Sequence, residues 1–287
     1  MSGIERVTVI GAGTMGHGIA QAAATAGWEV WLTDERAEAL PAAQASIARN
    51  LEGAVTRGKM ERATADAIQR RVHPTTSIVE AARGSDLVIE AVVEDLAVKQ
   101  AVLKKAASSA KARALLASNT SSLSIAELSA AVPCSSRFLG LHFFNPVHLM
   151  KLVEVVVHQR TTDEVKGEAL EIVKALGKEA IVVRDSPGFA SSRLGVVLGL
   201  EAMRMVEDGV ASAADIDRAM ELGYNHPMGP LKLTDLVGLD VRLKIAEYLY
   251  ASLGGAQYEP PEILRRLVAE GKLGKKSGEG FYEWKQS

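Results

Sequence analysis

The sequence predicts an α/β domain built on a mostly parallel sheet, followed by an all-helical C-terminal domain. Three observations predict it. Short β-branched runs alternate with helical patterns up to about residue 185, a glycine-rich turn directly follows the first run, and only helical patterns remain beyond that point. We therefore expect a Rossmann-type domain over residues 1–185, with helices on both faces of its sheet, and a helical domain over residues 186–287. A chain of 287 residues is long enough for two cores.

Composition indicates an ordinary globular protein. Hydrophobic residues make up 47% and charged residues 24%, and the formal net charge is −2, so no overall basic field would attract nucleic acid or a membrane surface. No apolar run reaches membrane-spanning length. The single cysteine, Cys134, favours a reducing compartment, and no signal-type region precedes the first strand, so we expect a cytoplasmic protein. The six histidines show no metal-ligand spacing, so no metal site is expected.

The first element is a strand over residues 6–10, followed by GAGTMG and an Ala-rich helix to about Ala26. This context is the one that the dinucleotide fingerprint G-x-G-x-x-G requires. The first glycine permits the tight turn, the second lets the backbone approach a pyrophosphate, and the third lets helix and strand pack closely. The candidate cofactor contacts in this turn are Gly11, Gly13, Thr14, Met15 and Gly16.

A second strand over residues 29–33 ends at Asp34, 18 residues after Gly16. An acidic side chain at this place can accept hydrogen bonds from the ribose hydroxyls of adenosine and repel a 2′-phosphate, which favours NAD over NADP. Because of Arg36, NADP stays an alternative cofactor: a nearby arginine could accommodate the 2′-phosphate.

A long helix is expected next, from about residue 36 to residue 59. Its last turn carries Arg57 and Lys59. The usual preference of cations for helix C-termini explains them as well as a role in binding an anionic part of the substrate does.

Two further buried strands are expected at residues 86–92 and 114–118. Glu94 and Lys99 follow the first, at the carboxyl edge where ligands gather in open α/β sheets, although plain solvent exposure is the alternative for both. Ser118 ends the second strand and begins a hydroxyl-rich loop. Ser124 and Glu127 form a capping box, whereas Ser121 has no such structural explanation and is expected at the mouth of the site.

The segment LGLHFFNPVHLMKLVEVVV, residues 139–157, predicts two strands around a tight loop centred near His148. Antiparallel pairing would place His142 directly opposite Glu154, with Cβ atoms roughly 5 Å apart. A buried carboxylate needs a partner, and a histidine held by one becomes a better general base at its other ring nitrogen. The alternative is that Glu154 pairs with Lys151 or reaches solvent while His142 is a core histidine.

The remaining chain predicts a helix over residues 162–176, a strand over 180–183 and a break at residues 185–188. Helices are then expected at 189–208, 213–222, 231–253 and 261–270. Apolar residues on the first of these exceed what one small domain can cover, which suggests a homodimer formed through the C-terminal helices. These residues are Leu194, Val197, Leu198 and Met205.

Several motifs in order carry a resemblance to a known family. They are GAGTMGHGIAQ, Asp34 at a strand end, SNTSSL, LGLHFFNPVHLMKLVEVV, DSPGF, GYNHPMGPLKLTDLVGLD and GKKSGEGFYEW. With them the chain resembles the L-3-hydroxyacyl-CoA dehydrogenases over nearly its whole length, and most closely the short 3-hydroxybutyryl-CoA type. The resemblance implies NAD-dependent oxidation of an L-3-hydroxyacyl-CoA to the 3-ketoacyl-CoA, within fatty-acid (β-oxidation) or butanoate metabolism.

The resemblance also implies residue roles. His142 would be the general base with Glu154 as its orienting partner, and Ser121 would contact the substrate. Glu94, Lys99, Ser118 and Asn145 match positions that line the cofactor site, while Arg57 or Lys59 lies where basic residues meet CoA.

One departure from the family concerns Ser192. The family usually has asparagine in a PGF-x-x-Asn-Arg pattern, and this chain has Ser192 before Arg193. Because serine is shorter than asparagine, the sequence does not predict which acyl chain length of the substrate is preferred. Two rival functions remain: a dehydrogenase of a hydroxy acid without CoA on the same fold, and a cofactor-binding protein without turnover.

Overall fold

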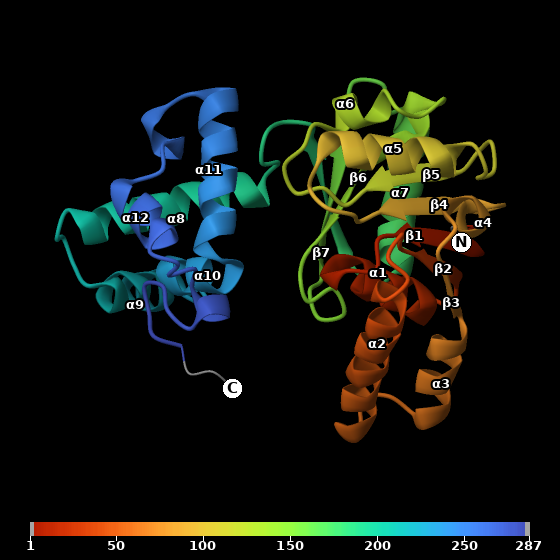
Figure 1. The fold of residues 1–287 in the computed structure, drawn as a ribbon, viewed down its shortest axis with the longest axis horizontal. Helices are drawn as coiled ribbons and strands as arrows, with labels where there is room; N and C mark the ends of the chain where they lie inside the picture. Colours follow the sequence, from red (N-terminus) through yellow and green to blue (C-terminus); the bar gives the residue numbers. More distant parts are fainter. Residues whose placement is uncertain (1–2, 285–287) are drawn as a thin grey trace. The chain divides into compact units, whose positions relative to one another are not determined.

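The computed structural model describes residues 3–284. The chain divides into two compact units, Met1–Asp185 and Ser186–Ser287, and each is described by itself (Figure 1).

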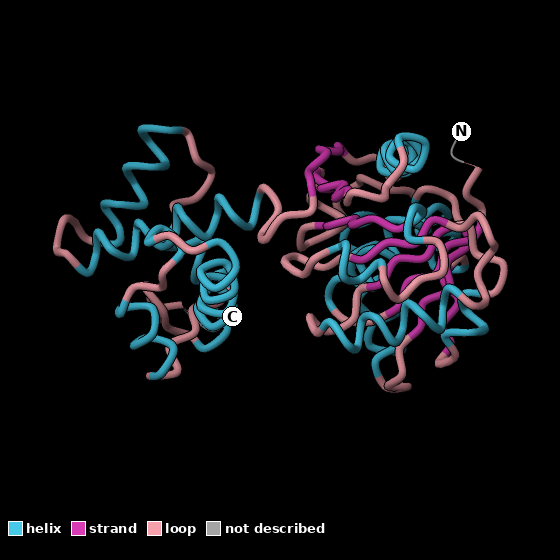
Figure 2. Tube along the Cα trace, turned by 90° about the horizontal axis from the view of Figure 1, so that it is seen from above, coloured by secondary structure: helices cyan, strands magenta, loops and turns pink. Residues whose placement is uncertain are grey.

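The first unit is built on one eight-stranded sheet in the order β3-β2-β1-β4-β5-β6-β7-β8, with helices on both faces (Figure 2). The pairing of β6 with β7 is antiparallel and the other neighbouring strands pair in parallel. The strands are β1 (Arg6–Ile10), β2 (Glu29–Thr33), β3 (Val72–Thr75), β4 (Leu87–Glu90), β5 (Leu115–Ser118), β6 (Phe138–Phe143), β7 (Leu152–Val157) and β8 (Glu179–Arg184).

The central strands β4, β5 and β6 are buried at every position. Parallel strands covered by helices on both faces have this pattern, because neither side of the sheet meets water. The predicted mostly parallel, Rossmann-type sheet is confirmed.

Four helices of the first unit, α4, α5, α6 and α7, begin at capping residues that the sequence supplies. The side chains of Ser77, Asp95, Ser124 and Thr162 each accept a hydrogen bond from the backbone N–H three residues further on. The helices are α1 (Thr14–Thr25), α2 (Ala39–Thr56), α3 (Arg62–Arg70), α4 (Ile78–Ala82), α5 (Leu96–Ala107), α6 (Ile125–Ser129) and α7 (Asp163–Ala175), with a 3₁₀ turn at Ser135–Arg137.

The stretch between α2 and β4 differs from prediction. The helix expected over residues 36–59 covers only Ala39–Thr56, and three short elements that the sequence did not predict follow it: α3, β3 and α4. Strand β3 has four residues, contains Pro74 and pairs with β2 alone, at the edge of the sheet. An edge strand tolerates proline and needs no apolar run, so the usual signal for a strand is missing here.

The second unit is helical within its described residues. It contains α8 (Ser191–Glu207), α9 (Ala213–Tyr224), α10 (Pro230–Val237), α11 (Leu239–Leu253) and α12 (Glu262–Ala269), with 3₁₀ turns at Ala256–Tyr258 and Lys275–Ser277. The single helix predicted over residues 231–253 is wrong. Gly238, at φ 102°, divides it into α10 and α11, and this left-handed conformation is one that glycine adopts without strain.

Two buried aspartates hold the C-terminal segment against this helical unit. The Asp235 carboxylate accepts hydrogen bonds from the backbone N–H groups of Phe281 and Tyr282 and from Trp284 Nε1. The Tyr282 hydroxyl donates to Asp217 at 2.7 Å. Burial, and then the Asp217 carboxylate, raise the pKa of Tyr282. The segment is therefore part of the folded unit.

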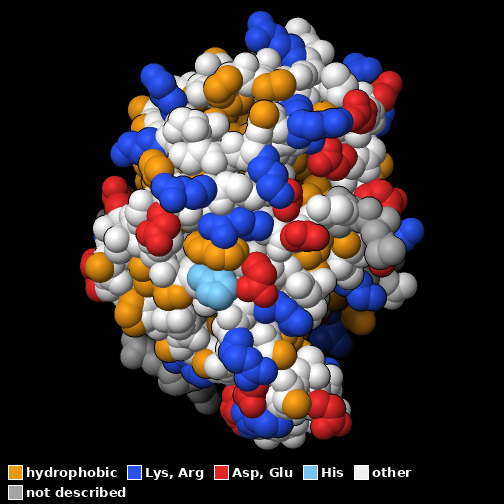
Figure 3. Space-filling view, turned by 90° about the vertical axis from the view of Figure 1, so that its right-hand side faces the viewer, with side chains coloured by type: hydrophobic (Ala, Val, Ile, Leu, Met, Phe, Trp, Pro, Cys, Tyr) orange, Lys and Arg blue, Asp and Glu red, His pale blue; other side chains and the backbone are white. Residues whose placement is uncertain are grey.

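The surface of the first unit carries both signs of charge. Figure 3 shows one face on which Lys and Arg side chains are interspersed with Asp and Glu, in keeping with the net charge of −2. Among residues 3–284, no helix is both long and apolar enough to cross a membrane.

Candidate active site

The glycine turn between β1 and α1 lies at the carboxyl edge of the sheet. Gly11 has φ 103°, and a Cβ there would lie 2.5 Å from the Ala91 carbonyl oxygen. A Cβ on Gly16 would lie 1.7 Å from the Gly11 carbonyl oxygen, so helix and turn touch at this point. A Cβ on Gly13 would meet nothing within 4 Å, and this residue is exposed. The turn is therefore closed by its outer glycines and leaves the backbone of the middle one open to a ligand.

Asp34 is fixed beside this turn. Its carboxylate accepts hydrogen bonds from the backbone N–H of Ala12 at 2.9 Å and of Arg36 at 3.0 Å, and the Arg36 guanidinium lies 3.4 Å away. A cavity of about 360 Å³ opens next to it. Apolar side chains form much of its wall, namely Ile78, Val92, Val93, Val98 and Val102, together with Gly11, Gly13, Asp34 and Arg36. An apolar cleft with the Asp34 carboxylate at its rim fits the adenosine half of NAD.

A buried ion pair stands at the ends of β4 and β5. The Lys99 side chain is only 1% exposed, and its ammonium lies 2.7 Å from a carboxylate oxygen of Glu90 and 3.2 Å from Glu94. The Ser118 hydroxyl, also buried, donates to Glu90 at 2.6 Å. Burial raises the pKa of Glu90, and Lys99 opposes that effect. Solvent exposure was therefore the wrong alternative for Lys99. Ser118 faces the Glu90 carboxylate inside the protein.

The Glu94 carboxylate organises the loop after β5. It accepts hydrogen bonds from the Thr120 hydroxyl at 2.6 Å, from the Ser121 backbone N–H at 2.9 Å and from both donors of Ser122. Burial works to raise the pKa of Glu94, but the Lys99 ammonium and these donors together lower it. Glu94 is thus held as an anion. The Ser121 hydroxyl lies 3.3 Å from the same carboxylate oxygen.

His142 and Glu154 face each other across β6 and β7, and the predicted antiparallel register is confirmed. Glu154 Oε2 lies 2.7 Å from His142 Nδ1; the glutamate is fully buried and the histidine is 7% exposed. A carboxylate can only accept this hydrogen bond, so Nδ1 carries the proton and Nε2 is the ring nitrogen left to accept one. Lys151, the alternative partner for Glu154, is exposed.

The position of this pair along the sheet brings it close to the Glu94 loop. Strand β6 pairs with β5, and the backbone N–H of Phe143 donates to the Asn119 side chain at 2.9 Å. The ring of Phe144 lies 4.5 Å from that of His142. His142, whose ring is bound to Glu154, therefore lies near the end of β6, next to the loop that carries Ser121.

The other predicted residues lie in three places. Asn145 is exposed in the loop after β6, and Arg57 and Lys59 are exposed at the C-terminal end of α2. Ser192 lies in the first turn of α8, in the helical unit. Among the described residues, no cluster of His, Cys, Asp and Glu could hold a metal ion.

The comparisons with known proteins agree with this geometry. Residues 6–186 match the family model described as 3-hydroxyacyl-CoA dehydrogenase, NAD binding domain, and residues 188–284 match that of its C-terminal domain. The chain belongs to the 3-hydroxyacyl-CoA dehydrogenase family. It is an NAD-dependent oxidoreductase, as the resemblance implied.

Relatives within this dehydrogenase family cover nearly the whole chain. A 3-hydroxybutyryl-CoA dehydrogenase of Clostridioides difficile is 42% identical over 97% of this chain and 99% of its own length. The crystal structure of (S)-3-hydroxybutyryl-CoA dehydrogenase PaaH1 from Ralstonia eutropha superposes with a TM-score of 0.94 at 38% identity, covering 99% of this chain and 100% of that one. A 3-hydroxyadipyl-CoA dehydrogenase of Escherichia coli is 41% identical over 99% of this chain and 60% of its own length.

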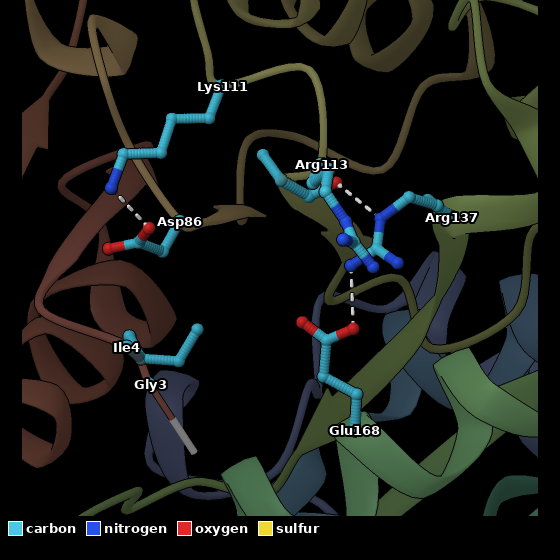
Figure 4. Close-up of a pocket in the computed structure, with 8 residues that line it drawn as sticks. Gly3, Ile4, Asp86, Lys111, Arg113, Arg137 and Glu168 are labelled. Carbon is cyan, nitrogen blue, oxygen red and sulfur yellow. Dashed lines mark hydrogen bonds and ion pairs between the residues drawn. The ribbon is translucent and has the colours of Figure 1, made fainter.

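A second cavity of this dehydrogenase, of about 300 Å³, lies at the amino ends of β4, β5 and β6, at the opposite edge of the sheet (Figure 4). Four of its five charged side chains pair with one another, and the fifth, Arg113, pairs with Glu164. Lys111 binds Asp86 at 2.5 Å, and Arg137 binds Glu168 at 2.6 Å. None of the predicted site residues lines it, so these pairs are best explained as structural.

Sequence reasoning missed one residue at the carboxyl edge, Glu90. It sits in the apolar run that forms β4, as Glu154 does in β7. A charged residue inside a buried strand was the signal used for Glu154, and the same signal could have found Glu90.

Proposed function

We propose that the chain oxidises a short-chain L-3-hydroxyacyl-CoA, such as 3-hydroxybutyryl-CoA, to the 3-ketoacyl-CoA with NAD as hydride acceptor. The observation that carries this proposal is the His142–Glu154 pair at 2.7 Å, at the carboxyl edge of a dinucleotide-binding sheet. The names of relatives that act on 3-hydroxybutyryl-CoA support the substrate.

The proposed chemistry uses His142 as general base. Its Nε2 accepts the proton of the 3-hydroxyl group, and bound NAD supplies the hydride acceptor. The ring becomes an imidazolium beside the buried Glu154 carboxylate, and this charge pair stabilises the protonated form. Positioned bases of this kind contribute about 10²–10⁴-fold to rate.

The cofactor would be held by the turn residues Gly11, Gly13, Thr14, Met15 and Gly16, by Asp34, and by Glu94 and Asn145 at the same edge. Lys99 and Ser118 would support this edge from inside the protein, where both are bound to Glu90. The fit rests on the open backbone at Gly13 and on the carboxylate of Asp34 beside the apolar cavity. Arg36 forms an ion pair with Asp34 at 3.4 Å in place of a 2′-phosphate, which agrees with NAD.

The substrate would meet Ser121 and Ser192 at its reacting end and Arg57 or Lys59 at its CoA end. Ser121 is already fixed by the Glu94 carboxylate. Arg57 and Lys59 are exposed cations at a helix end, suited to phosphate groups. We place the enzyme in the cytoplasm, as its single cysteine suggests.

The alternative is a hydroxy acid without CoA. Initial rates of NADH oxidation with acetoacetyl-CoA, compared with free acetoacetate and free sugar-derived keto acids at equal concentration, separate the two. We expect turnover with acetoacetyl-CoA and at least about 100-fold lower kcat/KM for the free acids, since remote binding groups contribute to the rate. Equal or better turnover of a free acid would overturn the proposal.

A further inference from the structure

Glu90 ends β4 at the carboxyl edge of the sheet, and its side chain is fully buried. A group in this position cannot touch a substrate or a cofactor directly. Its carboxylate accepts hydrogen bonds from the Lys99 ammonium at 2.7 Å, from the Val92 backbone N–H at 2.6 Å and from the Ser118 hydroxyl at 2.6 Å. Three donors around one carboxylate favour its ionised form.

A closed ring of hydrogen bonds runs from Glu90 to the loop after β5 and back. On one side, the Lys99 ammonium lies 3.2 Å from Glu94, whose carboxylate accepts from the Thr120 hydroxyl at 2.6 Å. On the other side, the Thr120 backbone N–H donates to the Ser118 hydroxyl oxygen at 3.2 Å, and that hydroxyl donates to Glu90. The ring therefore ties β4, β5, α5 and this loop together. Its members are buried, except that 38% of the Glu94 side chain is exposed.

Ser121 is attached to the exposed member of this ring. Its backbone N–H donates to Glu94 Oε1 at 2.9 Å, while Glu94 Oε2 faces the Lys99 ammonium. Glu94 lies in the turn between β4 and α5, so the direction of its carboxylate depends on that ammonium. Lysine has a flexible four-carbon stem, and here Glu90 and the Val92 carbonyl oxygen, at 3.2 Å, hold its end in place.

We propose that Glu90 is a positioning residue, whose buried carboxylate sets the place of Ser121 for the substrate through Lys99 and Glu94. This inference rests on the proposed function, in which Ser121 meets the reacting end of the acyl-CoA. With Glu90 ionised, Lys99 is held between two carboxylates, and Glu94 keeps one oxygen for the loop. Without that charge, the ammonium loses one of its two anionic partners and shifts toward Glu94, so the Ser121 N–H loses its fixed acceptor.

The test is a double-mutant cycle between Glu90 and Ser121, measured as kcat/KM for acetoacetyl-CoA at saturating NADH. Glu90→Gln keeps the size of the side chain but turns an amide NH₂ toward at least one of its three donors. We expect Glu90→Gln and Ser121→Ala each to lower kcat/KM about tenfold, as the loss of one well-placed hydrogen bond does. The double variant should also be about tenfold lower, because Ser121 is already out of place once Glu90 has lost its charge.

A residue that only stabilised the fold would give a different result. Its effect would be independent of Ser121, so the double variant would be lower by the product of the single effects, about 100-fold. Glu168→Gln is the matched control. This glutamate is also paired with a cation of the first unit, Arg137 at 2.6 Å, but it lines the cavity at the opposite edge of the sheet. Combined with Ser121→Ala, it should give the product of the two single effects.

Ser118→Ala is the second variant, for the case that Glu90→Gln does not fold. It opens the ring without removing a charge and should show the same non-additivity with Ser121→Ala. A product of the single effects in these cycles would reject the inference, and so would an unchanged kcat/KM in Glu90→Gln or in Ser121→Ala alone. The proposed function fails separately, if the wild type does not reduce acetoacetyl-CoA with NADH.

Discussion

At the scale of single residues, three glutamates at one edge of the sheet are kept in different states by their surroundings. Glu90 and Glu94 share the Lys99 ammonium, yet burial raises the pKa of the first, while Lys99 and the donors around the second lower its pKa against the effect of burial. Glu154 instead faces a histidine at 2.7 Å. Two of these acids therefore share one buried cation, whereas the third is bound to a histidine.

Ser192 tests the acyl end of the proposed site. Replacing it by the asparagine usual in the family, Ser192→Asn, lengthens a hydrogen-bonding side chain in the first turn of α8. We expect the dissociation constant of NADH to stay unchanged and kcat/KM to shift by several-fold across a series of acyl-CoA chain lengths, since one hydrogen bond contributes about 0.5–1.5 kcal/mol. If the variant and the wild type had the same kcat/KM for every chain length, residue 192 would have no role in acyl-CoA binding.

The pairing of His142 with Glu154 could be predicted from sequence because a strand, a short loop and a returning strand fix the register. His142 and Glu154 are equally far from the centre of the loop, and both interrupt apolar runs. The hydrogen bonds of Ser118 and Lys99 to Glu90 could not be predicted in this way. They join strands and helices whose spacing depends on how the parallel sheet is assembled.

At the scale of elements, two glycines of the turn between β1 and α1 have different roles. Gly16 is needed for the packing of the helix against the turn, and Gly13 leaves room for the cofactor. Gly16→Ala places a Cβ 1.7 Å from the Gly11 carbonyl oxygen, so the helix must move away from the turn. We expect this change to lower the free energy of unfolding by about 1–3 kcal/mol or more, measured by urea denaturation, and to weaken NADH binding as well.

Gly13→Ala is its matched control, because the added methyl group meets nothing within 4 Å in the protein. We expect its free energy of unfolding to change by less than about 1 kcal/mol, while the dissociation constant of NADH, measured by fluorescence titration, rises at least roughly tenfold as the methyl group obstructs the pyrophosphate. If both variants bound NADH as the wild type does, the turn would not be the cofactor site.

The elements that sequence predicted best are those with long patterns or clear caps. Strands β1 and β2 start where expected, and Ser124 caps α6 as predicted. Strand β3 gave no usual strand signal because it is short and lies at the edge with Pro74. The break at Gly238 was missed because apolar spacing continues through it and a single glycine inside a helical pattern is often tolerated.

At the scale of the whole molecule, the helical unit carries apolar side chains that its own core leaves exposed. Leu194, Leu222 and Tyr224 are each about 70% exposed, and Val210 is 63% exposed. Of the four residues that suggested a dimer, Leu194 alone is exposed, whereas Val197, Leu198 and Met205 are half-buried.

We expect sedimentation at micromolar concentration to give about twice the chain mass of 30.5 kDa. Leu194→Glu, combined with Leu222→Glu, should shift the protein toward the monomer, because two charges would be buried without partners. Val79→Glu, on the first unit and 45% exposed, is the control that keeps the mass unchanged. A monomeric wild type would reject the dimer.

The measurement that tests the central proposal most directly is the turnover of His142→Ala with acetoacetyl-CoA and NADH. With the ring base gone, we expect kcat to fall at least about 100-fold, while the dissociation constant of NADH stays within about twofold of the wild type. His73→Ala, remote from the site in β3, should turn over normally. Normal turnover in His142→Ala would contradict the proposal that this histidine, held by Glu154, carries out the proton transfer.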